Sequence, residues 1–562
     1  MNYIENLAKA IEKQTGLTAA EVAGMIEVPA DETMGDFALP CFKLAKTLKK
    51  APPVIADEIA NGMALPEGFK SFSVVGAYIN FFIDPVAFIA DVLKASGEEG
   101  YGGSDEGQGK NICIDYSSIN IAKPFHIGHI MSTAIGNALY RIYNYRGYTA
   151  IGINHLGDWG TQFGKLCYAY EAWGNKEDVE ARNIDALLAL YVKFHDEADK
   201  DDSLNDAARE WFKRIEAGDE YAVSLLDWFT EITLKRVNKV YEMLGVSFDY
   251  YTGERFYNDK MQPIVDELDA KGLLTESQGA RVVDLESYSM PPCIIIKNDG
   301  TTLYATRDLA AAFYRKKTFN FYKALYVVAY QQNLHFSQWF KVVGLMGYDW
   351  EKDLEHVNFG MVALEDGTIS TRKGRVVFLE DVLNKACEKT AEIIEIKNPG
   401  LENKTAIAKQ VGIGAVVFSV LSQGRIKDVT FTWDRVLNFE GETGPYMQYT
   451  AVRCNSLLVR GADLLNETPD FSALDNDEAF KTAKALDRFP SAIETALAKN
   501  EPYLITRNII DVAKAFNKFY FEHKIIDENK AASAARLALA KAVKNVITTG
   551  LYLIGVETPE KM

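Results

Sequence analysis

The segment from Asp115 to Gly164 constrains the fold more than any other part of the chain. A short, apolar, β-favouring run, ICIDY at 112–116, is followed after a polar stretch by apolar residues at helical spacing. These apolar positions are Ile127, Ile130, Met131, Ala134, Ile135, Ala138, Leu139 and Ile142. The pattern predicts a buried strand, a turn and an amphipathic helix.

Two histidines stand at the predicted start of that helix. His126 and His129 are three residues apart, so they share a face, next to unpaired backbone N–H groups that favour an anion. Gly128 leaves room for a nucleotide against the backbone, while the imidazoles can donate hydrogen bonds to phosphate oxygens. Lys123 adds a positive charge just upstream. Taken alone, the two histidines could equally well only cap a helix.

The residues around this pair resemble a known family. The motifs that carry the resemblance are Ser117 to Asn120, Ala122 to Pro124, His126 to His129, and Asn154 to Gly164 (NHLGDWGTQFG). They are similar to the catalytic start of arginyl-tRNA synthetases, which belong to the class I aminoacyl-tRNA synthetases. The resemblance implies an α/β protein with a Rossmann-like nucleotide-binding catalytic domain that is interrupted by an insertion.

A second motif resembles the mobile phosphate loop of the same family. Ser370, Thr371, Arg372 and Lys373 stand in a polar stretch between apolar segments, flanked by glycines that would let the loop close over ATP. Arg372 and Lys373 could neutralise charge on departing pyrophosphate. The alternative is a solvated basic turn. Class I enzymes often carry a lysine before the serine, where this chain has Thr368 and Ile369, and the resemblance transfers that charge to Lys123.

A third motif, DGTTLYATRDLAAAFYR at 299–315, indicates the amino-acid pocket. Tyr304 and Asp308 are four residues apart, hence on one face of a helix. A guanidinium pairs bidentately with a carboxylate, so such a pocket can prefer arginine over lysine. The resemblance implies that Asp308 binds the guanidinium, with Tyr304 and Gln332 beside it. Alternatively, Asp308 is a surface partner of Arg307 or Arg315.

Four further residues complete the expected substrate site by resemblance. Ser118, Asn120 and His129 correspond to positions that hold the backbone groups of the amino acid, and Asp115 lies where the family has an acidic residue near the substrate. Ile119 departs from the family pattern, because many relatives have proline there. The loss of proline could loosen the turn that carries Asn120.

Composition and resemblance together predict several domains. The N-terminal α+β domain should contact the tRNA, although a module without an RNA role is an equal alternative. Four aromatic residues near the C-terminus, Phe516, Phe519, Tyr520 and Phe521, could stack unpaired bases or belong to the core. The expected boundaries are 1–97 for the N-terminal domain, 98–110 for a glycine-rich linker, 111–390 for the catalytic domain with its helical insertion at about 172–257, 391–435 for a connecting helical segment, and 436–562 for an all-α anticodon-binding domain.

Composition adds limits. The six cysteines include no CxxC pair, so neither a disulfide framework nor a zinc site is expected, and no metal ligands are assigned. The N-terminus lacks an apolar signal region, and the apolar run near 411–421 is too short to span a bilayer, so a cytoplasmic protein without membrane contact is expected. With a net charge of −17, tRNA binding must rest on local basic patches, chiefly in the C-terminal third. The candidate cations, each of which could instead be a solvated helix residue, are Arg425, Lys427, Arg435, Arg453, Arg460, Lys481, Lys484, Arg488, Arg507, Lys514, Lys518 and Lys524.

The expected function is ATP-dependent activation of L-arginine to arginyl-adenylate and its transfer to the 2′-OH of the terminal adenosine of tRNA(Arg), with release of AMP and diphosphate. ATP is expected to act with Mg²⁺, activation to depend on bound tRNA, and a monomer is the default. Three alternatives stay open: a class I synthetase for another amino acid such as cysteine or glutamate, a small-molecule nucleotidyltransferase, and a synthetase-like RNA-binding protein without catalysis.

Overall fold

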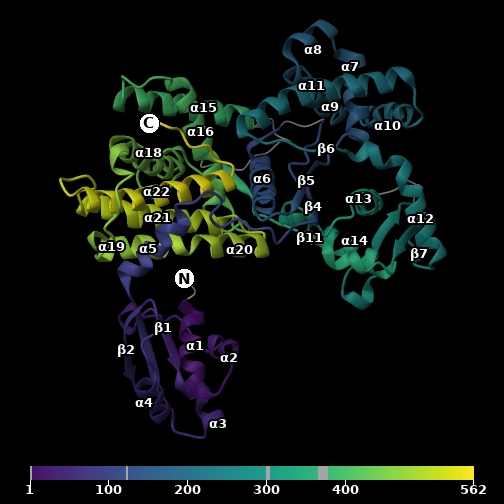
Figure 1. Ribbon diagram of the computed structural model, residues 1–562. Coiled ribbons are helices and arrows are strands. Elements are labelled where there is room, and N and C mark those ends of the chain that lie inside the picture. The colour runs from purple at the N-terminus through teal and green to yellow at the C-terminus, as the bar shows by residue number, and fades with distance from the viewer. Residues whose placement is uncertain (1–2, 122–124, 299–303, 365–376) are drawn as a thin grey trace. The chain divides into compact units, whose positions relative to one another are not determined.

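The chain contains two compact units, each assembled from distant parts of the sequence. The computed structural model describes residues 3–121, 125–298, 304–364 and 377–562 (Figure 1). The first unit contains Met1–Tyr101, Arg453–Arg488 and Asp511–Val546. The second contains Gly102–Val452, Phe489–Ile510 and Ile547–Met562, and it holds every described residue of the expected active site.

A five-stranded parallel sheet forms the centre of the second unit. Its strand order is β11-β10-β4-β5-β6, and every neighbouring pair is parallel. The strands are β4 (Asn111–Asp115), β5 (Thr149–Asn154), β6 (Tyr250–Tyr251), β10 (Lys323–Tyr326) and β11 (Leu354–His356). The chain proceeds from β4 to β5 on one side and places β10 on the other side, so the strand order reverses at β4. Parallel sheets bind ligands at such a switch point, beyond the carboxyl ends of the strands.

Close packing explains why the predicted strand and helix form where they do. The strand β4 is apolar and almost wholly buried, as expected for a parallel sheet covered on both faces. It leads to a 3₁₀ turn, η3 (Ile127–His129), and then to α6 (Ile130–Tyr145). A Cβ at Gly136 of α6 would lie 2.2 Å from Cγ of Tyr116, so only glycine lets this helix approach the strand end.

A large apolar core lies beside β10. It includes Trp339, Phe336, Leu309 and Tyr326, all buried. The helices that supply it are α12 (Met261–Ala270), α13 (Tyr304–Phe319) and α14 (Asn333–Leu345), and a small antiparallel sheet of β7 (Leu274–Ser277), β8 (Ala280–Val283) and β9 (Cys293–Ile296) adds to it. This core fixes α13 and α14, the two helices that carry the expected arginine pocket.

The expected insertion is helical. Between β5 and β6 lie α7 (Thr161–Trp173), α8 (Lys176–Arg182), α9 (Ile184–Ala198), α10 (Ser203–Glu216) and α11 (Glu220–Leu244). Their buried faces follow the helical period, for example Ala222, Leu225, Leu226 and Phe229 in α11. The helix α11 also reaches the active site, because its Tyr241 contacts the turn after β4.

After the phosphate-loop segment the chain is mostly helical. It includes β13 (Val429–Phe431), which pairs in parallel with β12 (Val362–Leu364), a strand that precedes the phosphate-loop segment. The helices are α15 (Leu379–Lys397), α16 (Lys404–Leu421), α17 (Trp433–Val436), α18 (Gly444–Arg460), α19 (Asp477–Asp487), α20 (Phe489–Lys499), α21 (Tyr503–Glu522) and α22 (Lys530–Leu553). Among the described residues, α16 is the one helix long and apolar enough to cross a bilayer, and 67% of it is buried within the protein.

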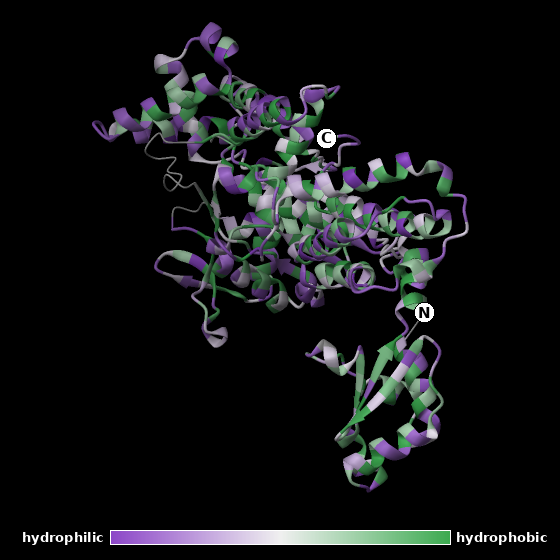
Figure 2. Ribbon diagram, turned by 90° about the vertical axis from the view of Figure 1, so that its left-hand side faces the viewer, coloured by the Kyte–Doolittle hydropathy of each residue, from purple (hydrophilic) through white to green (hydrophobic). Residues whose placement is uncertain are grey.

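The N-terminal domain is an α+β fold, as expected. Its antiparallel sheet has the order β1-β3-β2. The strands are mostly hydrophobic, whereas the helices beside them carry both hydrophobic and hydrophilic residues (Figure 2). The elements are α1 (Tyr3–Thr15), α2 (Ala19–Ala23), β1 (Phe37–Pro40), α3 (Ala45–Leu48), α4 (Pro52–Gly62), β2 (Phe69–Val75), β3 (Tyr78–Ile83) and α5 (Pro85–Ser96). The helix α5 packs against α19 in the same unit, where the rings of Phe88 and Phe480 lie 5.5 Å apart.

Candidate active site

The turn after β4 is strained and heavily bonded. Ser117 and Ser118 both have positive φ angles, 67° and 44°, a conformation that non-glycine residues rarely adopt. The backbone N–H of Ser117 donates to Oγ of Ser132 at 2.8 Å, and Oγ of Ser118 donates to Asp115 at 2.6 Å. Strain of this kind persists only where the surroundings enforce it, and it gathers at functional sites. The turn thus presents Ser118 at the carboxyl end of the sheet.

Asp115 belongs to a buried ion pair. Its Oδ2 lies 2.8 Å from Nη2 of Arg315, and the two side chains are only 8% and 2% exposed. Although burial disfavours the charged guanidinium, Asp115 raises the pKa of Arg315 well above its usual value. Asp115 therefore holds Ser118 and Arg315 in place. The partnership of Arg315 was not indicated by the sequence, although its position two helical turns after Asp308 is visible there.

The two histidines cap their own helix. The Nδ1 atom of His126 accepts from the backbone N–H of Gly128 at 3.1 Å, and the backbone N–H of His126 donates to Nδ1 of His129 at 3.1 Å. When neutral, the His126 ring therefore carries its proton on Nε2, from which it could donate to a phosphate, whereas Nδ1 of His129 also lies 3.1 Å from the carbonyl oxygen of His126, so the contacts of that ring fit either neutral tautomer. A Cβ at Gly128 would lie 2.8 Å from the His126 ring, so the glycine lets that imidazole fold back onto the turn. The capping interpretation and the phosphate-binding interpretation are thus both compatible with this geometry.

Asp308 has no arginine partner among its two expected candidates. Arg315 pairs with Asp115, and Arg307 pairs with Glu254, whose Oε2 lies 2.8 Å from Nη1 of Arg307. Instead, Oδ2 of Asp308 lies 2.6 Å from Nε2 of His335, and about a quarter of each side chain is exposed. Within the part of the chain that the structure describes, Asp308 is thus the one of these three carboxylates that is not bonded to an arginine.

Glu254 lies close to Asp308. Burial raises the pKa of Glu254 to about 7; Arg307 opposes this, while the nearby carboxylates of Asp308 and Asp158 add to it. A second acid therefore stands beside the expected guanidinium pocket and is easily protonated. No sequence pattern indicates Glu254 or His335, because each meets α13 only through the fold.

Tyr304 lies on α13, which carries Asp308, Gln332 directly precedes α14, which carries His335, and Asn120 lies in the turn after β4. Tyr304 begins α13 and is 60% exposed, and Gln332 is exposed at the start of α14. Asn120 forms a parallel bridge with Gly157, and the carbonyl of Ile119 accepts from the backbone N–H of Gly157 at 2.8 Å. The turn that has isoleucine in place of proline is therefore held by the chain after β5.

The start of α14 is anchored to a distant segment. Oδ1 of Asn333 accepts from Asn358 at 3.0 Å, and Oδ1 of Asn358 accepts from Nη1 of Arg425 at 2.6 Å. The Nε of Arg425 donates to the carbonyl of Asn500 at 3.2 Å, and its backbone N–H donates to Glu501 at 3.0 Å. Arg425, expected among the tRNA-binding cations, is thus an internal bridge between α14 and the turn that precedes α21.

The remaining predicted catalytic residues, Lys123, Ser370, Thr371, Arg372 and Lys373, lie outside the described residues. Among the described residues, no group of three or more histidine, cysteine or acidic side chains could hold a metal ion.

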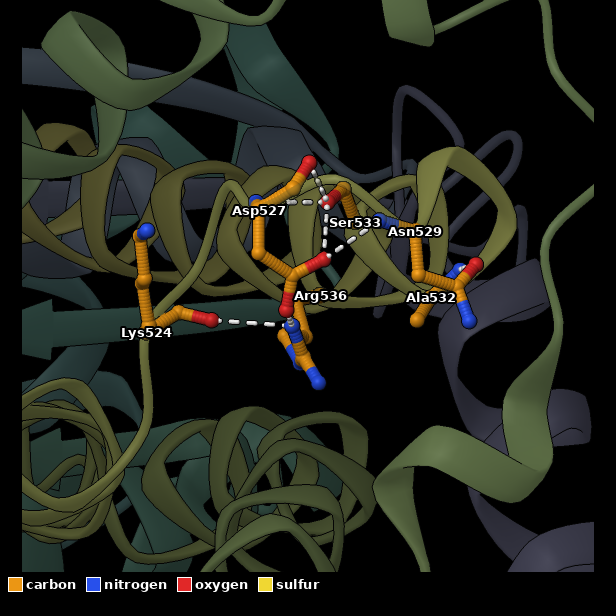
Figure 3. Close-up of polar contacts among 6 residues, drawn as sticks. All are labelled: Lys524, Asp527, Asn529, Ala532, Ser533 and Arg536. Carbon is orange, nitrogen blue, oxygen red and sulfur yellow. Dashed lines mark hydrogen bonds and ion pairs between the residues drawn. The ribbon is translucent and has the colours of Figure 1, made fainter.

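The C-terminal aromatic residues differ in exposure. Phe516 and Phe519 are fully buried, whereas Phe521 is 87% exposed. In the same domain, the side chain of Asp527 stabilises the connection between α21 and α22. It accepts hydrogen bonds from Arg536 at 2.6 Å and from Ser533 at 3.2 Å (Figure 3). Two of the four aromatic residues are therefore core, and Phe521 is the one that solvent reaches most.

Family models match three successive parts of the chain. The family model described as "tRNA synthetases class I (R), catalytic domain" matches residues 91–433. The arginyl-tRNA synthetase N-terminal domain model matches residues 1–83, and the DALR anticodon binding domain model matches residues 447–562. The protein is therefore a class I aminoacyl-tRNA synthetase. It has the N-terminal, catalytic and C-terminal parts that the sequence predicts.

Individual relatives narrow the assignment. An arginine–tRNA ligase of Alkaliphilus metalliredigens is 54% identical and covers 97% of both chains, and one of Halothermothrix orenii is 53% identical over the full length of both. The solved arginyl-tRNA synthetase of Thermus thermophilus shares the fold, with a TM-score of 0.82 at 22% identity over 100% of this chain and 99% of that one. The chain belongs to the arginyl-tRNA synthetase family, which confirms the resemblance seen in the sequence.

Proposed function

We propose that the site at the β4 switch point is where this chain activates arginine for transfer to tRNA. The chain is an aminoacyl-tRNA ligase of the arginyl family, and its reaction is the ATP-dependent charging of tRNA(Arg) with arginine. The observation that carries the assignment to this site is the pairing of acids with arginines. Arg315 takes Asp115 and Arg307 takes Glu254, which leaves Asp308 to receive a guanidinium from outside.

The chemistry needs positioning more than it needs a nucleophile from the protein. Asp308 binds the guanidinium, with Tyr304 and Gln332 beside it, while Ser118, Asn120 and His129 hold the amino-acid backbone. The substrate carboxylate then attacks the α-phosphate of ATP in line. The imidazoles of His126 and His129 donate to phosphate oxygens as charge moves to pyrophosphate.

Charge on the departing pyrophosphate calls for further cations. We assign this role to Lys123 and to the loop of Ser370, Thr371, Arg372 and Lys373, as the sequence resemblance implies. Mg²⁺ enters with ATP as part of the substrate complex. The arginyl group next passes to the 2′-OH of the terminal adenosine, and AMP leaves.

We assign tRNA contacts to both ends of the chain: the N-terminal domain and the DALR domain. Within the DALR domain, the exposed ring of Phe521 is available for stacking on a base, whereas Phe516 and Phe519 are structural. We further propose that tRNA is needed for the activation step, that the protein acts as a monomer and that it works in the cytoplasm. Sedimentation of the pure protein tests the monomer directly.

The deciding experiment is ATP–pyrophosphate exchange by the pure protein with arginine, with and without tRNA. Lysine, glutamate and cysteine serve as controls. Exchange with arginine only in the presence of tRNA supports the whole proposal. Exchange without tRNA removes the tRNA requirement alone, and exchange that prefers another amino acid overturns the assignment of the pocket.

A further inference from the structure

We propose that His335 is a positioning residue that sets the carboxylate plane of Asp308, and thereby the preference of the pocket for a guanidinium over an ammonium group. The inference deepens the proposed function and rests on it. It starts from the 2.6 Å contact between Nε2 of His335 and Oδ2 of Asp308. Because an ionised carboxylate can only accept, the histidine nitrogen is the donor.

The contact leaves one edge of Asp308 for the substrate. His335 uses a single lone pair of Oδ2, and no other residue that the structure describes bonds to the carboxylate, so Oδ1 and the second lone pair of Oδ2 can accept two parallel N–H bonds from a guanidinium. The side-chain torsion that turns a carboxylate plane is soft, and no staggered minimum holds it. A donor on one oxygen therefore decides which way the open edge faces.

His335 is itself held firmly enough to act in this way. It lies in the first turn of α14, whose starting residue Asn333 is bonded through Asn358 to Arg425. The next residue, Phe336, is buried and stacks on the ring of His356 at 4.2 Å. The imidazole thus projects from an anchored helix start toward α13, which carries Asp308.

The orientation of the carboxylate matters differently for the two kinds of cation. A guanidinium is a planar fork that needs a coplanar acceptor edge, whereas an ammonium is a compact point charge with rotatable donors. Losing the His335 hydrogen bond should therefore weaken guanidinium binding and leave ammonium binding nearly unchanged. A loss of charge or of pocket shape would instead weaken both ligands.

The test measures inhibition by agmatine and cadaverine, two competitors that carry a guanidinium and an ammonium group but cannot react because they lack the carboxylate. Arginine-dependent exchange in the presence of tRNA supplies the assay. His335→Phe keeps a ring but removes the donor, and His335→Gln keeps an N–H donor. Lys341→Met is the matched control: Lys341 also lies on α14, and the change breaks its 2.9 Å ion pair with Glu351, which lies beyond the helix.

We expect His335→Phe to raise the KM for arginine and the Ki of agmatine about tenfold, as loss of one hydrogen bond to a charged group implies. The Ki of cadaverine and kcat should change less than about twofold. His335→Gln should recover most of the loss, and Lys341→Met should match the wild type.

Two results would overturn the inference while leaving the proposed function intact. One is an unchanged arginine KM in His335→Phe, and the other is an equal loss of agmatine and cadaverine. If the wild type itself showed no exchange with arginine, the proposed function would fail first and the role of His335 would fall with it.

Discussion

The two ends of the candidate active site are built in opposite ways. At the phosphate end, His126, Gly128 and His129 hold one another through bonds that span two or three residues. At the arginine end, Asp308 meets His335 from the next helix, and Arg307 meets Glu254, which is 53 residues away in the sequence. The histidine contacts at the first end lie within one turn, although the backbone of that turn also pairs with a distant segment, where the Ile127 N–H donates to the Val377 carbonyl at 3.1 Å. The two contacts at the second end both join separate elements of the fold. Substitutions should therefore act locally at one end and through distant partners at the other.

The largest effect is expected from Asp308→Asn. The change removes the carboxylate that we propose binds the substrate guanidinium, and loss of one partner of a charged pair costs about 4 kcal/mol, or roughly 10³-fold in kcat/KM for arginine. The KM for ATP should stay the same, because the histidine turn is untouched. Exchange kinetics with varied arginine and varied ATP measure both. The exposed Asp266 on α12 offers Asp266→Asn as a control of equal charge change. Equal damage to ATP binding would contradict the separation of the two ends.

At the phosphate end, Gly128→Ala should be the most damaging small substitution. The added Cβ would meet the His126 ring at 2.8 Å and push the imidazole off the turn. A displacement on the order of 1 Å can cost about 10²-fold in rate, so we expect kcat to fall by that amount with little change in the arginine KM. Gly400→Ala is the control, because a Cβ there meets nothing within 4 Å. A raised arginine KM with normal kcat would show that the two ends are not separate.

This difference also explains how much the sequence could predict. The strand, the turn and the capping histidines follow from residues within a few positions of one another, so the pattern at 112–142 predicts them, and the resemblance supplies their role. The partners of Asp308 do not follow in this way. Both arginines proposed as its alternatives, Arg307 and Arg315, bind other acids, and Glu254 and His335 approach from elsewhere in the fold. Arg425 is one of the cations that the sequence offers for tRNA, but its side chain bonds to Asn358 and Asn500 within the protein. The identity of a charged residue does not reveal its partner.

Lowering the pH should weaken the binding of arginine selectively. With a folded-state pKa of about 7, raised from 4.5, Glu254 is ionised above neutral pH and protonated below it. Protonation removes a negative charge near the guanidinium, so the arginine KM should rise about three- to tenfold as the pH falls from 8 to 6. In Glu254→Gln the KM should be high and nearly independent of pH. A wild-type KM that stays flat over this range would exclude Glu254 from the pocket.

The smallest effect is expected from Arg425→Lys. The substitution keeps the charge but loses the fork that joins Asn358 to Asn500, so α14 should start less firmly. We expect the arginine KM to rise about threefold and amide hydrogen exchange to quicken near Asn333, since local anchoring contributes on the order of 1 kcal/mol. Arg281→Lys, in an exposed ion pair of β8, should change neither. Faster amide hydrogen exchange at His126 instead of near Asn333 would contradict the role of Arg425 as an anchor of α14.

The pairing of acids and arginines in this pocket has a consequence for inactivating mutations. If arginine binds at Asp308 as we propose, it does so near Arg307 and Arg315 of the chain itself, and Glu254 is the partner of Arg307. A variant without Glu254 would release a guanidinium that is covalently attached next to Asp308. The chain would then act as its own competitive inhibitor, and its lost activity would return at high concentrations of free arginine, which is not how a misfolded enzyme behaves.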